Sequence, residues 1–250
     1  MNLTSGRRID GDIVERDMDL DGIPGVLWTP VSGSHPAPLI LLGHPGGVAS
    51  MYPRLVARAR QAAAIGCAAA TIELPGSGDR ARVGALDRAR TELRETLAAG
   101  RVVDAAIIDR LILPLVDTAV PEWQATMDAL LALPGLGGPV AWSGGVVAMG
   151  VRLAAVDPRI VAAGLFAGSF IPLTAFADAR QVHIPVHVLL QWDDEGNDRQ
   201  AALDLFDAFA SEQKTLHAST GGHTGVPAHA AEDATRFFAR HLTAGGHSIA

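Results

Sequence analysis

Short apolar runs alternate with longer helix-like segments along most of this 250-residue chain. The run Pro38–Gly43 contains no polar side chain, which is typical of a central strand buried on both faces. Further strand-like runs follow at Ala68–Leu74, Pro139–Trp142, Ile160–Phe166, Val186–Gln191 and Lys214–Ala218. Strands that alternate with helices predict an α/β fold, in which a mainly parallel central sheet has helices on both faces.

The length suits a single domain over residues 1–250, but one stretch breaks the alternation. Residues 79–120 are too many for a plain crossover after Ala68–Leu74, which is the fourth predicted strand when the runs Ile13–Asp17 and Val26–Thr29 are counted. Their charged first part predicts a helix over Leu86–Ala98, and their second part is apolar. We interpret 79–120 as a helical insertion that forms a small cap over a pocket, with extra core or an oligomer surface as the alternative. Pro121 predicts the start of a separate helix, Glu122–Leu133.

Composition and charge argue against several classes of function. The net charge of −7 and the lack of a basic cluster argue against a nucleic-acid partner. No apolar run approaches the roughly 18 residues of a membrane span, and Met1–Asp21 lacks the apolar core of a secretory signal, so a cytoplasmic location is expected. The single cysteine, Cys67, makes no internal disulfide, and neither zinc spacings nor phosphate-loop motifs occur. The expected partner is a small-molecule substrate, without cofactor or metal, and a homodimer is left open.

Ser143 stands where a predicted strand turns sharply into a helix. Small residues, Ala141 and Gly145, lie two places before and two places after it. A nucleophile elbow needs this pattern, because its tight turn excludes bulky neighbours and leaves the serine hydroxyl exposed above the sheet. The N–H of Gly144, at the start of the helix, is then able to point at a developing oxyanion. A serine that only caps the helix would give the same pattern.

An acid and a histidine follow two later strands. Asp194 lies just past the run Val186–Gln191, where a carboxylate can orient a histidine, and Asp193 competes for that role. His223 follows the last predicted strand between glycines that bring an imidazole over the sheet edge. Either residue, taken alone, is also typical of a solvated turn. The order serine, acid, histidine predicts a nucleophile–acid–base triad.

A glycine-rich loop follows the strand Pro38–Gly43 and reads Gly-His-Pro-Gly-Gly. Loops of this kind supply a second backbone donor to an oxyanion. Because proline has no N–H, Pro45 cannot donate, and Gly46 or Gly47 must do so. An ordinary glycine-rich turn would look alike. Three side chains beside these turns are expected to contact the substrate: His44, Trp142 and Trp192.

Four stretches together carry a resemblance to a known family, namely Leu41–Gly47, Leu74–Arg80, Gln191–Asp194 and Gly221–Pro227. They resemble the α/β-hydrolase superfamily, and in particular its dienelactone-hydrolase-like esterases, over nearly the whole chain. The resemblance implies hydrolysis of esters, lactones or related carbonyl compounds without a cofactor. It makes Ser143 the nucleophile, His223 the base and Asp194 the acid. The N–H groups of Gly144 and Gly46 would form the oxyanion hole.

The chain departs from the family pattern at three places. Pro45 interrupts a loop that usually reads His-Gly-Gly-Gly, and Ser77 stands in a turn that usually reads Pro-Gly-His-Gly. In relatives that share the ending Asp157–Ile160, the nucleophile stands one residue nearer to that ending. This register puts Gly144, not Ser143, at the nucleophile position. Either the helix has gained a residue or the nucleophile is gone.

Three functions follow from these residues. The first is a serine hydrolase that cleaves an ester or lactone of a small, fairly apolar substrate through an acyl-enzyme at Ser143. The second is a repurposed enzyme of secondary metabolism, in which His223 and Asp194 act as general base and acid in C–C cleavage, cyclisation or elimination. The third is a non-catalytic binding protein that keeps only the pocket.

Overall fold

The computed structural model describes residues 1–33, 36–166 and 170–243. Within them the strands are β1 (Asn2–Leu3), β2 (Arg7–Ile9), β3 (Ile13–Leu20), β4 (Ile23–Pro30), β5 (Ala37–Gly43), β6 (Ala68–Ile72), β7 (Leu136–Gly144), β8 (Ile160–Phe166), β9 (Val186–Gln191) and β10 (Lys214–Ser219). The helices are α1 (Val48–Ala64), α2 (Gly84–Ala98), α3 (Ala105–Leu131), α4 (Val147–Val156), α5 (Thr174–Ala179), α6 (Arg199–Ala208), α7 (Ala228–Phe238) and a π-helical turn η1 (Ala239–Thr243).

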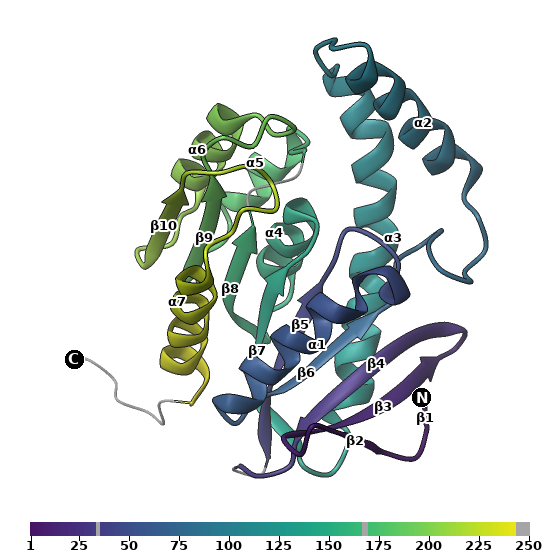
Figure 1. Cartoon of the computed structure of the whole chain (residues 1–250), viewed down its shortest axis with the longest axis vertical. Coiled ribbons are helices and arrows are strands. Elements are labelled where there is room, and N and C mark those ends of the chain that lie inside the picture. The colour runs from purple at the N-terminus through teal and green to yellow at the C-terminus, as the bar shows by residue number, and fades with distance from the viewer. Residues whose placement is uncertain (34–35, 167–169, 244–250) are drawn as a thin grey trace.

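All the strands belong to one twisted sheet (Figure 1). Its order is β1-β3-β4-β6-β5-β7-β8-β9-β10, and β2 pairs with β3. The pairs on the N-terminal side, from β1 to the β4–β6 pair, are antiparallel, and every pair from β6 to β10 is parallel. The predicted fold class is therefore confirmed, and the predicted strands Ile160–Phe166 and Val186–Gln191 coincide with β8 and β9.

Side chains of the central strands alternate between two buried layers. In β5, Leu39 and Leu41 contact the larger layer, and Ile40 and Leu42 contact the smaller one. Helices α3, α4 and α6 cover the larger layer, while α1 and α7 cover the smaller. A strand with both faces buried needs apolar residues at every position, which explains why β5 is apolar throughout.

Helix α3 runs without a break from Ala105 to Leu131, so the prediction of a separate helix that begins at Pro121 was wrong. Pro114 and Pro121 both lie inside it. A proline costs an internal helix about 3 kcal/mol, through a lost hydrogen bond and a clash. Here apolar side chains on both sides of Pro121 are buried against the sheet, among them Val120 and Trp123. Their burial offsets that cost and holds the helix together.

The predicted helix at Leu86–Ala98 is confirmed as α2, which packs against α3. The two helices extend beyond the sheet as a pair, at the upper right of Figure 1. An ion pair connects the segment before α2 with α3. Both terminal nitrogens of the Arg80 guanidinium donate to the Glu122 carboxylate, at 2.5 and 2.8 Å. In the part of the chain that the structure describes, no helix has the length and apolar character needed to cross a membrane.

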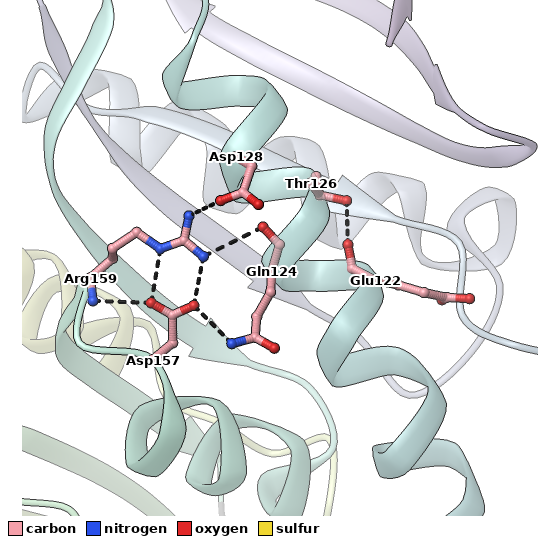
Figure 2. A network of polar contacts seen from close by, with 6 residues as sticks. All are labelled: Glu122, Gln124, Thr126, Asp128, Asp157 and Arg159. Atoms are coloured by element: carbon pink, nitrogen blue, oxygen red, sulfur yellow. Dashed lines mark hydrogen bonds and ion pairs between the residues drawn. The ribbon is translucent and has the colours of Figure 1, made fainter.

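A polar network fastens the turn between α4 and β8 to α3 (Figure 2). The buried Asp157 carboxylate accepts hydrogen bonds from Arg159 Nε at 2.9 Å and Nη2 at 2.6 Å. It also accepts one from Gln124 Nε2 at 3.1 Å, while Arg159 reaches on to Asp128. The Arg159 side chain is the main reason that the pKa of Asp157 lies below its ordinary value.

Asp157→Asn is expected to lower the free energy of unfolding at pH 7 by about 1.5–3 kcal/mol, because hydrogen bonds to a charged group are lost. A carboxyl whose pKa is lower in the folded state stabilises the fold fully above its unfolded pKa of about 4. That contribution is lost as the pH falls through the folded-state pKa. Urea unfolding at a series of pH values from 7 to 3 should therefore show the difference between wild type and variant shrinking.

The matched control is Asp128→Asn, at a side chain of the same network that is 72% exposed. It should cost less than about 1 kcal/mol, because solvent screens an exposed pair. A difference for Asp157→Asn that is the same at every pH would contradict the ionic role of this carboxylate.

Candidate active site

The parallel strands bring four chain segments to one edge of the sheet. The carboxyl ends of parallel strands point the same way, so the residues that follow β5, β7, β9 and β10 lie on a common side. These are the glycine-rich loop after Gly43, the turn Gly144–Gly145, the turn with Asp194 and the loop with His223. Every residue of the predicted triad therefore comes from this edge.

Asp194 and His223 form a hydrogen-bonded pair. His223 Nδ1 lies 2.7 Å from Asp194 Oδ2, and only 3% of the Asp194 side chain is exposed, against 50% for His223. The N–H of Gly196 donates to Asp194 Oδ1 at 3.2 Å, which fixes the carboxylate. Asp193 instead accepts from the N–H of Gly221 and holds the loop. A carboxylate on Nδ1 keeps the proton there and leaves Nε2 free to act as a base.

Ser143 lies inside β7, paired with Leu42 and Gly164 on the neighbouring strands. The sharp turn comes after it, where Gly144 and Gly145 have φ angles of +71° and +75°, and α4 begins only at Val147. The expectation that the turn falls on Ser143 and that Gly144 starts the helix was therefore wrong. The strained backbone of an elbow falls on Gly144, which is the register indicated by the Asp157–Ile160 ending.

Glycine is required at both positions of this turn. A Cβ at Gly145 would lie 2.7 Å from the Cα of Gly43, and a Cβ at Gly144 would lie 2.8 Å from a guanidinium nitrogen of Arg58. The Cα of Gly43 is a backbone atom and cannot move away to make room for a Cβ. Because β5 and β7 pair directly, the turn after β7 must pass against the end of β5, and this close approach requires glycine at position 145. At position 144 the positive φ favours glycine.

Arg58 of α1 is the polar neighbour of Ser143. Its guanidinium donates to Ser143 Oγ at 2.9 Å, to the carbonyl oxygen of Ser143, and to the carbonyl oxygen of Gly43 at 2.8 Å. Burial lowers the pKa of Arg58 to about 10, so it stays protonated at neutral pH. Within the described residues, no carboxylate pairs with Arg58, and no hydrogen bond joins Ser143 to His223.

A cavity of about 450 Å³ lies between α1, α7 and the face of the sheet. Ser143, Arg58, His187 and His223 are among its polar lining residues. Most of the other lining side chains are apolar, including Ile40, Leu42, Met51, Ala62, Leu165, Leu189, Val226 and Phe238. Of the residues that the structure describes, none from α2 or α3 lines it. The cavity therefore brings Ser143 and His223 to one apolar space.

The three side chains expected to contact the substrate lie elsewhere. Trp142 is fully buried, with its ring 5.2 Å from that of Trp123, because it points to the opposite face of β7 from Ser143. His44 is buried, and its Nε2 lies 2.9 Å from the carbonyl oxygen of Ile72. Trp192 is on the surface beneath the guanidinium of Arg199. None of the three is a lining residue of the cavity.

Two cavity residues were not found from the sequence. The sequence does contain a signal for Arg58, because this charged residue occupies the apolar stripe of α1, three residues after Leu55 and four before Ala62. His187 has none, since it sits within the run of β9. Burial lowers the pKa of His187 to about 4, so it is neutral, and its Nδ1 lies 2.9 Å from Thr215 Oγ1. No group of acidic, His or Cys side chains among the described residues is arranged to hold a metal ion.

Comparisons with known proteins find relatives only among solved structures. No family model matches the sequence, and no curated protein matches it. A cold-adapted esterase from an Arctic intertidal metagenomic library is 28% identical, with a TM-score of 0.70 over 97% of this chain and 100% of that one.

Two more distant structures share the fold alone. Acetyl xylan esterase 1 from Thermoanaerobacterium is 13% identical, with a TM-score of 0.62 over 96% of this chain and 87% of that one. Dienelactone hydrolase from Anabaena variabilis is 16% identical, with a TM-score of 0.54 over 88% of this chain and 92% of that one.

Proposed function

Because this chain belongs to the α/β-hydrolase superfamily and resembles its dienelactone-hydrolase-like esterases, we propose that it hydrolyses carboxylic esters or lactones. One observation carries the proposal: a buried carboxylate orients His223, which opens onto the same apolar cavity as Ser143. The similarity of the whole chain to an esterase supports the reaction class.

In the proposed mechanism, Ser143 Oγ attacks the substrate carbonyl while His223 Nε2 takes the hydroxyl proton. Asp194, at 2.7 Å from Nδ1, stabilises the imidazolium that forms. The departing alcohol takes the proton back from His223, and water then cleaves the acyl-enzyme by the same route. The mechanism requires Ser143 Oγ and His223 Nε2 to come within hydrogen-bond distance in the cavity that both residues line.

The cavity favours a small, fairly apolar acyl group. Its volume of about 450 Å³ lies within the range of sites for small molecules, and its walls are mostly aliphatic and aromatic. Apolar side chains outnumber polar ones in its lining, so we expect an acyl chain to fit it better than a sugar ring with many hydroxyls. We therefore expect short and medium acyl chains, or small lactones, as substrates.

The position of the turn supports a second candidate function. The strained backbone falls on Gly144, and the hydroxyl of Ser143 accepts a hydrogen bond from Arg58. In this alternative, His223 and Asp194 act as general base and acid on water or on the substrate itself, without a serine nucleophile. This alternative uses the same cavity and the same pair, His223 and Asp194, as the serine-hydrolase mechanism. It differs only in that no acyl-enzyme forms.

Hydrolysis of p-nitrophenyl acetate, butyrate and octanoate by the purified protein tests the proposal. We expect release of p-nitrophenol, and we expect Ser143→Ala to lower kcat by more than about 1,000-fold. Ser77→Ala is the matched control, because this hydroxyl bonds the carbonyl oxygen of Leu74 outside the cavity. It should keep the wild-type rate.

Two results would contradict parts of the proposed function. A folded protein that hydrolyses none of these esters, nor simple lactones, contradicts ester hydrolysis. Hydrolysis that survives Ser143→Ala at the wild-type rate supports the second candidate, in which His223 activates water directly.

A further inference from the structure

The loop after β5 does not supply a backbone donor to the cavity. Pro45 is the residue of that loop which lines the cavity, next to Gly43 at the end of β5, and neither Gly46 nor Gly47 is among the lining residues within the described chain. Pro45 has no N–H to donate. The side where a serine hydrolase usually places its second oxyanion donor therefore presents no loop amide from Gly46.

The guanidinium of Arg58 lies at this same place. It contacts the carbonyl oxygens at the ends of β5 and β7, together with Ser143 Oγ. A guanidinium has five N–H donors, and these three contacts leave two without a partner among the described residues. The two remaining donors are on Nε and Nη1, because Nη2 uses both of its hydrogens on Ser143. An oxyanion requires hydrogen-bond donors of this kind, on a cation that contacts the reacting oxygen.

The charge of Arg58 is also uncompensated. Its partners are two carbonyl oxygens and a hydroxyl, and no carboxylate of the described chain lies within ion-pair distance. A partly buried cation without a counter-ion is costly to keep in a fold. The same cation interacts strongly with any negative charge that develops nearby, because little water screens the cavity.

We propose that Arg58 is a catalytic residue of this chain, whose side chain stabilises the oxyanion in place of the amide of the β5 loop. The inference rests on the proposed ester hydrolysis. When the bond between Ser143 Oγ and the carbonyl carbon forms, the proton moves to His223 and the C=O electron pair moves onto the carbonyl oxygen. The free N–H donors of Arg58 bind that oxygen. Collapse restores the C=O bond and expels the alcohol, which takes the proton from His223.

The proposal is tested with Arg58→Met, which removes the charge, and Arg58→Lys, which keeps it, on the ester that wild type hydrolyses best. Loss of an oxyanion donor typically lowers kcat about 100- to 1,000-fold, and we expect that loss for Arg58→Met with little change in KM. Arg58→Lys should recover part of it. Arg60→Ala is the matched control, an arginine on the same helix α1 that pairs with Asp10 and is not a lining residue of the cavity. It should keep the wild-type kcat.

Chemical rescue separates catalysis from a structural role. Millimolar guanidinium chloride should restore part of kcat to folded Arg58→Ala and leave wild type and Arg60→Ala unchanged. An active wild type whose kcat is unaffected by Arg58→Met overturns this inference alone. The same follows if Arg58→Lys and guanidinium both fail to restore activity to a folded variant. A wild type without any esterase activity overturns the proposed function, and this inference falls with it.

Discussion

Replacing His223 with alanine should lower kcat for ester hydrolysis by about 1,000-fold or more, without unfolding the protein. General bases contribute about 100- to 10,000-fold, and in this site no other histidine can take over. His187, the other described histidine that lines the cavity, has its pKa lowered to about 4 by burial and makes a weak base. The His223 side chain is half exposed, so truncation opens no core cavity. Steady-state kinetics with circular dichroism as the folding check give the measurement.

His217→Ala is the matched control for that variant. His217 also pairs with a carboxylate, since its Nδ1 lies 3.1 Å from Asp233 Oδ2, but it is not a lining residue of the cavity. It should retain the wild-type kcat. Asp194→Asn should lose about as much as His223→Ala, because the imidazole loses the partner that fixes its protons. If His223→Ala keeps more than a tenth of the activity, the proposed base is wrong.

Trp142→Ala should lower the free energy of unfolding by about 3–5 kcal/mol, the usual cost of truncating a buried tryptophan. Trp142 is fully buried under the strand that carries Ser143, edge-on to Trp123 at 5.2 Å. Its Nε1 also donates to the carbonyl oxygen of Gly144 at 2.8 Å, so the variant loosens the turn. Urea unfolding of the purified variants measures the loss.

Trp192→Ala provides the comparison for this experiment. The Trp192 side chain is on the surface, and its truncation should change stability by no more than about 0.5 kcal/mol. If Trp142→Ala leaves the free energy of unfolding unchanged and raises KM, the packing role is contradicted. Trp142 would then contact the substrate, as the sequence predicts.

The fold was accessible from the sequence because its strands are buried on both faces. A strand such as β5 must be apolar at every position, and that run stands out against the helices around it. The continuous helix α3 was missed for a physical reason. Proline is a local signal, whereas the burial of Val120 and Trp123 that overrides Pro121 depends on the assembled core.

The site was accessible in part. His223 and Asp194 were found because each follows a strand and the order of the chain matches a known arrangement, and the structure joins them at 2.7 Å. The position of the turn after β7 was not predicted correctly, since the spacing Ala141-x-Ser143-x-Gly145 favours a turn at Ser143, while the Asp157–Ile160 ending indicates one at Gly144. The packing of Gly145 against Gly43 and the positive φ angles of both glycines place the turn after Ser143.

Arg58 is a site residue that no sequence motif identifies. An arginine on the apolar stripe of α1 is visible in the sequence, but two of its partners are backbone carbonyls on separate strands, one of them 85 residues away in the chain. Backbone groups leave no pattern in the sequence. The interactions that place a charge beside Ser143 therefore emerge only from the pairing of β5 with β7.

The central claim is that Ser143 is a nucleophile activated by His223. The most direct measurement is intact and peptide mass spectrometry after treatment with a fluorophosphonate, with Ser143→Ala and His223→Ala alongside. We predict one adduct, on Ser143, absent from Ser143→Ala and formed much more slowly in His223→Ala. A folded protein that hydrolyses esters but carries no adduct, or carries it on another residue, would contradict the claim.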